Sequence, residues 1–325
     1  MVIHTSQTGR ILQRMKAIRI HNYGDGEALV YEDAPLPEPG PEDVRVRVHA
    51  AGVNPVDWKI REGYLSAMLP YPMPLTLGWD VSGVVEQVGA NVSGVSIGDA
   101  VYSRPDIARN GAYAQYVVVR ASEVAPKPGS LSHNEAAAVP LAALTAWQGL
   151  FDHAKLGKGE RVLVHAGAGG VGSFAIQFAK WAGAHVIATA SAANESLVRE
   201  LGADEFVDYR SQRFEDVLEN VDVVLDTIGG ETQERSFSLL GDGARLFSVV
   251  GTPDADKLAA AGASGGMFMV QPSRDELGRI ASLIDEGTVR VLIDSVFPLS
   301  EARAAHAKSQ TGRARGKIVL EVVAE

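Results

Sequence analysis

Five residues of one short loop have the types and spacing needed to hold the phosphates of a dinucleotide. The loop, GAGGVG, fits the pattern G-x-G-x-x-G and closely follows the apolar run at 162–164. In such a loop the first glycine allows a tight turn, the second lets the backbone approach a pyrophosphate, and the third lets a helix pack closely on the strand. The helix start adds free N–H groups. The residues expected to hold the pyrophosphate are Gly167, Gly169, Gly170, Val171 and Gly172.

The elements around this loop favour a nucleotide site over a glycine turn that fits the pattern by chance. Apolar residues at helical spacing follow the loop, and strand-like runs recur at 185–189, 222–226 and 244–250. Strands that alternate with helical patterns predict a doubly wound parallel sheet, in which ligands lie at the carboxyl ends of the strands. We therefore predict an α/β dinucleotide-binding domain.

The residues after the second strand bear on the choice of cofactor. NAD sites place an acidic residue about 20 residues after the glycines, on the ribose hydroxyls, and the segment 188–194 contains none. A 2′-phosphate is then not repelled, which favours NADPH over NADH. The residues expected near the adenosine and its phosphate are Ser191, Asn194, Tyr209 and Arg210, and the guanidinium of Arg210 would supply the charge. The alternative is that Tyr209 and Arg210 only end a strand at the surface. Val250 and Gly251 end a further strand and are also expected to contact the cofactor.

The first 140 residues have a different pattern from the middle of the chain. Residues 44–49 alternate between apolar and polar, as in a strand with one solvated face, and short apolar runs are separated by glycine and proline. This pattern predicts a small β-barrel. After it come helices expected at 275–286 and 300–308, then a strand at 317–323 expected to return to the β-rich domain, whereas the small residues at 259–266 suggest a loop. The predicted division is an N-terminal extension at 1–14, the β-rich domain at 15–140, the dinucleotide-binding domain at 141–266 and a returning segment at 267–325.

Composition excludes several classes of function. The net charge of −10 argues against a nucleic-acid partner, since phosphate binding needs a basic surface. The sequence has no apolar run of the roughly 18 residues that a membrane span needs, and its N-terminus lacks the apolar core of a secretory signal, so we expect a cytoplasmic protein. The absence of cysteine excludes disulfides and thiolate catalysis, and the eight histidines show no ligand spacing, so no metal site is expected.

The chain resembles the medium-chain dehydrogenase/reductase superfamily, and within it the zinc-independent quinone oxidoreductase-like branch. The matching segments lie at 50–57, 78–85, 111–116, 167–172 and 201–204, and the resemblance covers nearly the whole chain from Met15. It implies a GroES-like β-barrel catalytic domain, a Rossmann domain, a cleft between them, hydride transfer with NADPH, and a homodimer or tetramer. Zinc-dependent relatives have a ligand cysteine near the position of Asn54 and Gly-His-Glu in place of Gly78-Trp79-Asp80. Without zinc as a Lewis acid, quinones and activated alkenes become the favoured acceptors.

Three further residues gain expected roles from this resemblance. It implies that the Asn54 side chain faces the nicotinamide or the substrate, where its amide would donate to a developing oxyanion; the alternative is a turn asparagine before Pro55. Lys59 would lie near the nicotinamide ribose or help to donate a proton; the alternative is a solvated helix lysine. Thr145 matches a family threonine near the nicotinamide and is otherwise an ordinary helix residue. Asp57 is expected to cap a helix that begins at Trp58.

These observations favour an NADPH-dependent reductase of quinones or α,β-unsaturated carbonyl compounds, working as a homodimer. One alternative is an NADPH-binding sensor or structural partner with little catalysis, which would bind the cofactor tightly without turnover. Another is an NADH-linked alcohol dehydrogenase, which the missing zinc ligands disfavour.

Overall fold

The computed structural model describes residues 13–323, which form two compact units. The first unit comprises Met1–Leu141, Gln271–Asp285 and Val291–Glu325, and the second comprises Ala142–Val270 and Glu286–Arg290. Most of the expected extension at 1–14 lies outside the described residues. Among the described residues, no helix is both long and apolar enough to cross a membrane.

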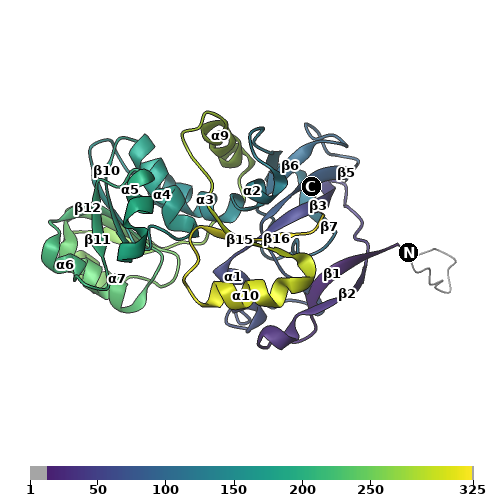
Figure 1. The fold of residues 1–325 in the computed structure, drawn as a ribbon, viewed down its shortest axis with the longest axis horizontal. Helices are drawn as coiled ribbons and strands as arrows, with labels where there is room; N and C mark the ends of the chain where they lie inside the picture. The colour runs from purple at the N-terminus through teal and green to yellow at the C-terminus, as the bar shows by residue number, and fades with distance from the viewer. Residues whose placement is uncertain (1–12, 324–325) are drawn as a thin grey trace. The chain divides into compact units, whose positions relative to one another are not determined.

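The second unit is built on a six-stranded parallel sheet (Figure 1). Its strands are β9 (Arg161–Val164), β10 (His185–Ala190), β11 (Glu205–Asp208), β12 (Val221–Asp226), β13 (Leu240–Ser248) and β14 (Ser264–Met267). They lie in the order β11-β10-β9-β12-β13-β14. Numbered along the chain, this order is 3-2-1-4-5-6, the doubly wound arrangement that the alternating pattern predicts. The order reverses between β9 and β12, and β9 is the strand that leads into the glycine loop.

Apolar strands and one long helix give this unit its core. Leu163, Ile187, Val224 and Leu246, one from each of four strands, are almost completely buried. The helix after the loop, α4, buries Phe174 and Phe178 among other residues of its apolar face. The helices of this part of the chain are α3 (Pro140–Trp147), α4 (Gly170–Trp181), α5 (Glu195–Glu200), α6 (Phe214–Val217), α7 (Gly230–Ser236) and α8 (Ala255–Ala260).

The prediction of a loop at 259–266 is wrong, because this segment contains the end of α8 and most of the edge strand β14. Small residues are required here, since the backbone of β14 lies very close to that of β13. A Cβ on Gly265 would lie 2.0 Å from the carbonyl oxygen of Leu246. A strand held by backbone pairing alone shows no apolar pattern, so the sequence resembles a loop.

The first unit contains two antiparallel-rich sheets. The smaller is β1 (Arg14–Ile20) between β2 (Val30–Pro35) and β4 (Leu75–Thr76). The larger runs β15-β16-β3-β5-β6-β8, with β7 paired on β3. The strands of the larger sheet are β3 (Asp43–Val53), β5 (Val81–Val88), β6 (Ala100–Ser103), β7 (Tyr116–Arg120), β8 (Val124–Pro126), β15 (Ile293–Pro298) and β16 (Lys317–Glu321).

The strand β3 organises this unit, because it pairs with β5, β7 and β16. Its residues Val44, Val46 and Val48 are buried, as the alternation predicts. The last strand, β16, pairs antiparallel with β3 and parallel with β15, so the C-terminal segment does return to the β-rich part. The helices are α1 (Pro55–Arg61), α2 (His133–Ala137), α9 (Arg274–Asp285) and α10 (Ala302–Gln310), and α10 lies beside α1 (Figure 1).

Candidate active site

The glycine loop joins β9 to α4, as the sequence predicts. Gly169 is the N-cap of α4, and the N–H of Ser173 donates to its carbonyl at 3.0 Å. The N–H groups of Gly170, Val171 and Gly172 precede this first helical bond, so they have no acceptor within the helix. They form a helix N-terminus of the kind that binds phosphate.

Packing around the loop requires glycine at Gly172, is tight at Gly167, and brings a single atom near Gly169. A Cβ on Gly172 would lie 2.3 Å from the carbonyl oxygen of Ala166, and one on Gly167 would lie 3.0 Å from the Ala188 side chain. A Cβ on Gly169 would meet only the Ala166 carbonyl oxygen, at 3.2 Å. Ala166 itself has φ +54°, an unusual conformation for a residue with a side chain. The loop therefore fits a pyrophosphate that approaches the backbone near Gly169.

A buried histidine, His165, forms hydrogen bonds that hold the start of the glycine loop in place. One nitrogen of His165 lies 3.2 Å from the hydroxyl of Thr189 and the other lies 2.9 Å from the hydroxyl of Ser236. Burial lowers the pKa of His165 to about 4, so the ring is neutral at pH 7. The carbonyl of Thr189 in turn accepts the N–H of Gly167 at 2.9 Å. Side-chain and backbone bonds thus fix the start of the loop.

The four expected adenosine contacts follow two neighbouring strands. Ser191 and Asn194 come after β10, and Tyr209 and Arg210 come after β11, which pairs with β10 up to Ala190 and Asp208. The structure therefore brings these residues to one corner of the sheet. The amide of Asn194 donates to the Ser191 hydroxyl at 3.3 Å, and the Arg210 guanidinium lies over the Tyr209 ring, 5.7 Å from its centroid.

A buried carboxylate holds the last of the expected cofactor contacts. Asp226, at the end of β12, accepts the Ser248 hydroxyl at 2.9 Å and the N–H of Gly229 at 2.9 Å. The N–H groups of Val250 and Gly251 lie 3.2 and 3.4 Å from the same Ser248 hydroxyl. Asp226 thus ties the ends of two adjacent strands together at the edge that carries the glycine loop.

The expected catalytic residues fall in both units. Thr145 lies in α3 of the second unit and is 3% exposed. Asn54 and Lys59 lie in the first unit, where Asn54 caps α1. The Lys59 ammonium lies 5.7 Å from the centroid of the Trp58 ring, on a half-buried part of the same helix. The roles expected of these three residues stay predictions.

Asn54 is not a solvated turn residue, because its side chain lies between two buried charges. Its Nδ2 donates to Asp80 at 2.8 Å, and its Oδ1 accepts a hydrogen bond from the Lys317 ammonium. The same ammonium lies 3.0 Å from Asp80, and the exposed fractions of these two charged side chains are 4% and 0%. The second Asp80 oxygen accepts the N–H of Leu141 at 2.5 Å. Neither Asp80 nor Lys317 has an expected role from the sequence.

The helix after Asn54 begins earlier than expected, so the prediction that Asp57 caps it is wrong. Pro55 occupies the first helical position, where its fixed φ and missing N–H cause no loss. Asp57 therefore lies inside the first turn, and its carboxylate accepts the Asn54 N–H at 2.8 Å and the Tyr113 hydroxyl at 2.7 Å. Complete burial raises the pKa of Asp57 to about 7.

A chain of buried polar groups continues from Asp57. The hydroxyl of Tyr113 lies 3.3 Å from Nε2 of His306, whose Nδ1 lies 3.1 Å from the Arg61 guanidinium. Burial, followed by the nearby Arg61, lowers the pKa of His306 to about 3, so the ring is neutral at pH 7. Tyr113 lies in a segment that carried the family resemblance, but a single sequence does not show that His306 reaches it.

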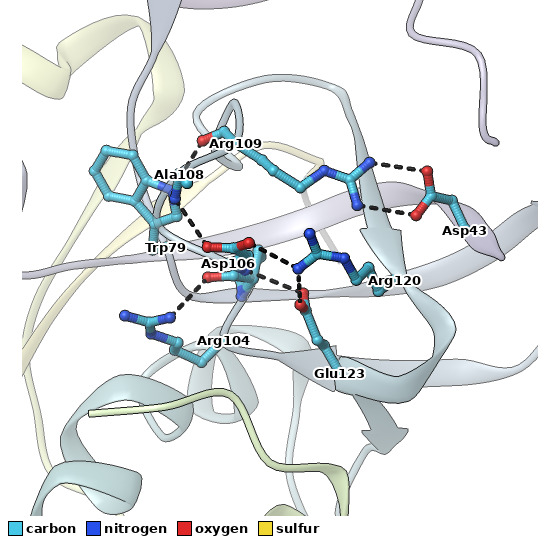
Figure 2. Close-up of polar contacts among 9 residues, drawn as sticks. Asp43, Trp79, Arg104, Asp106, Ala108, Arg109, Arg120 and Glu123 are labelled. Carbon is cyan, nitrogen blue, oxygen red and sulfur yellow. Dashed lines mark hydrogen bonds and ion pairs between the residues drawn. The ribbon is translucent and has the colours of Figure 1, made fainter. Parts of the chain in front are cut away.

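A second polar cluster holds Trp79, the residue before Asp80, and the segment 104–123 (Figure 2). The buried indole of Trp79 donates to the carbonyl of Arg109 at 3.1 Å, and Arg109 forms two 2.9 Å hydrogen bonds with Asp43. Arg120 bridges Asp106 and Glu123 at 2.7 and 2.9 Å.

The guanidinium of Arg104 points away from the Arg120 cluster (Figure 2) and is 3% exposed. It donates to the Pro105 carbonyl at 3.3 Å, and its Nε has no partner in the described part of the chain. Burial lowers the pKa of Arg104. Arg104 is therefore a buried cation with weak direct pairing.

The residues around Asn54 do not fit a zinc ion. At the positions where the family resemblance places zinc ligands, this chain has the amide of Asn54, the indole of Trp79 and the carboxylate of Asp80. The Trp79 indole is a hydrogen-bond donor, and it already donates to a carbonyl. The oxygen of Asp80 that faces Asn54 is in contact with the Lys317 ammonium. Within residues 13–323, no three histidine, aspartate or glutamate side chains group as metal ligands would.

Comparisons with known proteins support this architecture. The alcohol dehydrogenase GroES-like domain model matches residues 40–129, and the zinc-binding dehydrogenase model matches residues 201–320. The chain is 36% identical over 355 residues to the mitochondrial NAD(P)H oxidoreductase RTN4IP1 of Danio rerio, covering 95% of this chain and 92% of the relative. It is 36% identical over 332 residues to the 2-methylene-furan-3-one reductase of Solanum lycopersicum, covering 98% and 82%. The solved quinone oxidoreductase from Coxiella burnetii superposes with a TM-score of 0.89 at 35% identity, covering 95% and 100%.

A dinucleotide-binding sheet joined to a GroES-like unit defines a nicotinamide-dependent oxidoreductase. The chain belongs to the medium-chain dehydrogenase/reductase superfamily and, within it, to the quinone oxidoreductase-like family. The family resemblance and the fold class predicted from the sequence are thereby confirmed.

Proposed function

We propose that this chain is a zinc-independent, NADPH-dependent reductase that transfers hydride to quinones or α,β-unsaturated carbonyl compounds. The observation that carries the proposal is the Asn54–Asp80–Lys317 arrangement, which puts a buried ammonium where a metal site would need a free carboxylate. The names of two relatives support the acceptor classes: one is a quinone oxidoreductase, and the other reduces 2-methylene-furan-3-one, an alkene conjugated to a ketone.

The second unit supplies the residues that would hold NADPH. The free N–H groups at the start of α4 would bind the pyrophosphate. Ser191, Asn194 and the exposed Arg210 would bind the adenosine and its 2′-phosphate, with no carboxylate in the segment 188–194 to repel it. When bound, NADPH supplies a hydride. The protein's own contribution is to orient the reactants and to stabilise charge on the acceptor.

The first unit supplies the polar groups for the acceptor. Hydride addition puts negative charge on the acceptor oxygen, and a proton completes the reduction to a hydroquinone or a saturated carbonyl compound. Asn54 would donate an amide N–H to that oxygen. Lys59 would provide the proton, directly or through water, and Thr145 would contact the nicotinamide. Each assignment is testable by substitution.

The first test is NADPH oxidation by the purified protein, with 1,4-benzoquinone in one assay and 3-buten-2-one in another. Turnover of either acceptor supports the proposal, and the preferred one shows whether quinones or alkenes are the main substrates. Tight NADPH binding, seen as a change in cofactor fluorescence, without turnover of either acceptor would overturn it in favour of a sensor.

The choice of NADPH is tested by R210Q, with R199Q as the matched control. Arg210 and Arg199 are both exposed, but Arg199 pairs with Glu195 inside α5. Losing a charged contact to the 2′-phosphate should raise the KM for NADPH about tenfold, with the KM for NADH unchanged. An equal effect on both cofactors, or none, would contradict the assigned role of Arg210.

The homodimer and the cytoplasmic location expected from the sequence stay predictions. Light scattering during gel filtration tests the first, and fractionation of the source cells tests the second.

A further inference from the structure

The side-chain amide of Asn54 is held by two oppositely charged groups that come from distant parts of the chain. Asp80 follows 26 residues later and receives the Nδ2 hydrogen bond at 2.8 Å. Lys317 follows 263 residues later, on β16, and its ammonium donates to Oδ1. Both charged groups are buried and lie 3.0 Å from each other. All three side chains belong to the first unit.

Hydrogen-bond chemistry determines which way this amide points. An ammonium has only donors, so the Asn54 atom that faces Lys317 must be the oxygen. An ionised carboxylate has only acceptors, so the atom that faces Asp80 must be the nitrogen. The orientation is therefore determined by two independent contacts and is not an arbitrary choice between similar atoms. One Nδ2 hydrogen is used by Asp80, and the direction of the second is fixed.

The main chain of Asn54 is held as firmly as its side chain. Its N–H donates to Asp57 at 2.8 Å, and its carbonyl accepts the N–H of Asp57 at 3.0 Å. A cation at the amide oxygen also draws electron density from the nitrogen, which makes the remaining N–H a stronger donor. Because Asp80 balances the charge of Lys317, this polarisation adds no net charge to the buried site.

We propose that Lys317 is a positioning residue for the reaction: together with Asp80 it orients and polarises the Asn54 amide, so that the second N–H of Asn54 stabilises the charge on the acceptor oxygen. This inference rests on the proposed role of Asn54. It assigns a function to the lysine of the last strand, which otherwise is only one half of a buried ion pair. A purely structural pair would support folding and leave the chemistry of the folded protein unchanged.

A double-mutant cycle on turnover separates these two roles. The variants are N54A, the pair K317M/D80N, and the triple variant. The pair removes both charges together, because removing one would leave the other buried and unpaired. It also leaves two amides that can bond in either orientation. Each variant is first checked by circular dichroism and thermal melting, and kcat is then measured with 3-buten-2-one and 1,4-benzoquinone at saturating NADPH.

We expect N54A to lower kcat with the enone by about 100-fold, the usual effect of losing one oxyanion donor. K317M/D80N should lower it by at least tenfold, and the triple variant should be no slower than N54A. The KM for NADPH should stay within twofold throughout. The variant K317Q/D80N, whose glutamine still donates to Asn54 Oδ1, should recover part of the lost activity. If K317M/D80N does not fold, K317R and K317Q/D80N are compared instead.

The results that would overturn the inference differ from those that would overturn the proposed function. If the losses from N54A and K317M/D80N multiply in the triple variant, Lys317 does not act through Asn54 and the inference fails. If N54A turns over the enone at the wild-type rate, Asn54 is not the donor and the inference also fails, although the reductase function stands. Only the absence of turnover by the wild-type protein, with NADPH bound, overturns the proposed function itself.

Discussion

Asp57 carries a fully buried carboxyl group whose pKa is raised to about 7 by burial, against an ordinary value of 3.8. Hydrogen bonds from Asn54 and Tyr113 and the charge of Lys317 oppose this rise without cancelling it. Below pH 4 the carboxyl group is protonated in both the folded and the unfolded chain. Between about pH 4 and 7 the unfolded chain ionises first, so this group makes the folded state progressively less stable as the pH rises.

We predict that D57N abolishes this part of the pH dependence. The asparagine oxygen still accepts from Asn54 and Tyr113, and it cannot ionise. The free energy of unfolding of D57N minus that of the wild type should therefore rise between pH 4 and 7 and level off above pH 7. Urea denaturation of both proteins across this range measures it, and a difference that does not vary with pH would contradict the raised pKa. Comparing the two proteins cancels the opposite effects of His165 and His306.

Arg104 gives a second prediction about a buried charge. Its guanidinium is 3% exposed, and its one direct hydrogen bond in the described structure goes to the neighbouring Pro105 carbonyl. Because a poorly paired buried cation is costly, R104M should keep or raise the melting temperature. R109M is the contrasting control and should lower it, since Arg109 bonds Asp43 through two nitrogens. Equal losses in both variants would show that Arg104 stabilises the fold.

Sequence reasoning succeeded at single residues where the constraint is local. The spacing of Gly167, Gly169 and Gly172 correctly placed a turn between β9 and α4, whereas their binding of a pyrophosphate stays a prediction. It failed where a partner is remote: Lys317 meets Asn54 and Asp80 only because β16 returns to β3. The available signal for this buried contact was a lysine at the start of an apolar strand. A strand whose first residue is exposed to solvent has the same sequence pattern, so the signal does not show that Lys317 is buried.

At the scale of elements, the junction of β9 with α4 leads to a prediction about the cofactor. G172A would put a Cβ 2.3 Å from the Ala166 carbonyl oxygen and 2.8 Å from the Gly167 backbone, so the loop must move. We expect NADPH to bind about 10- to 100-fold more weakly, as a displacement of about 1 Å at a binding loop implies. Fluorescence titration measures the Kd.

The matched control is G278A in α9, where a new Cβ meets nothing within 4 Å. It should leave NADPH binding unchanged and raise stability by about 1 kcal/mol, because alanine favours a helix over glycine. An unchanged Kd in G172A would show that the loop tolerates a side chain at this position.

Elements with strong periodicity were predicted correctly, and those without it were not. The strands β9, β10, β12 and β13 appear as apolar runs, and α4 as a helical pattern. The edge strand β14 has no such pattern because glycine is needed for its close approach to β13. The start of α1 was misplaced because Asn54-Pro55 suits a loop as well as a helix start.

At the scale of the molecule, the first unit depends on the strand β16, which comes from a part of the sequence far from β3. The strand β16 lies between β15 and β3, so a chain ending at Gly316 would lack the strand that joins β15 to the rest of the sheet and the ammonium that pairs with Asp80. We predict that this truncated chain loses the fold of its first unit and still binds NADPH, because the second unit keeps all of its strands.

Limited proteolysis with mass spectrometry measures this outcome, and a resistant fragment near residues 142–270 is expected. Resistance of the whole truncated chain, as in the wild type, would contradict it. The return of the last strand was predicted from its isolation at the end of the sequence. The short piece Glu286–Arg290 of the second unit was not, because a link of five residues has no pattern of its own.

The position of β16 in the sequence also determines when the first unit can be completed during synthesis on the ribosome. Asn54 and Asp80 leave the ribosome early, whereas Lys317 is made only after every strand of the second unit. At typical elongation rates of about 5–20 residues per second, β3 waits many seconds for β16 with one edge unpaired. The second unit can be complete during this time. Until β16 is made, the nascent first unit therefore exposes an unpaired strand edge, which is a site for unwanted pairing with other chains.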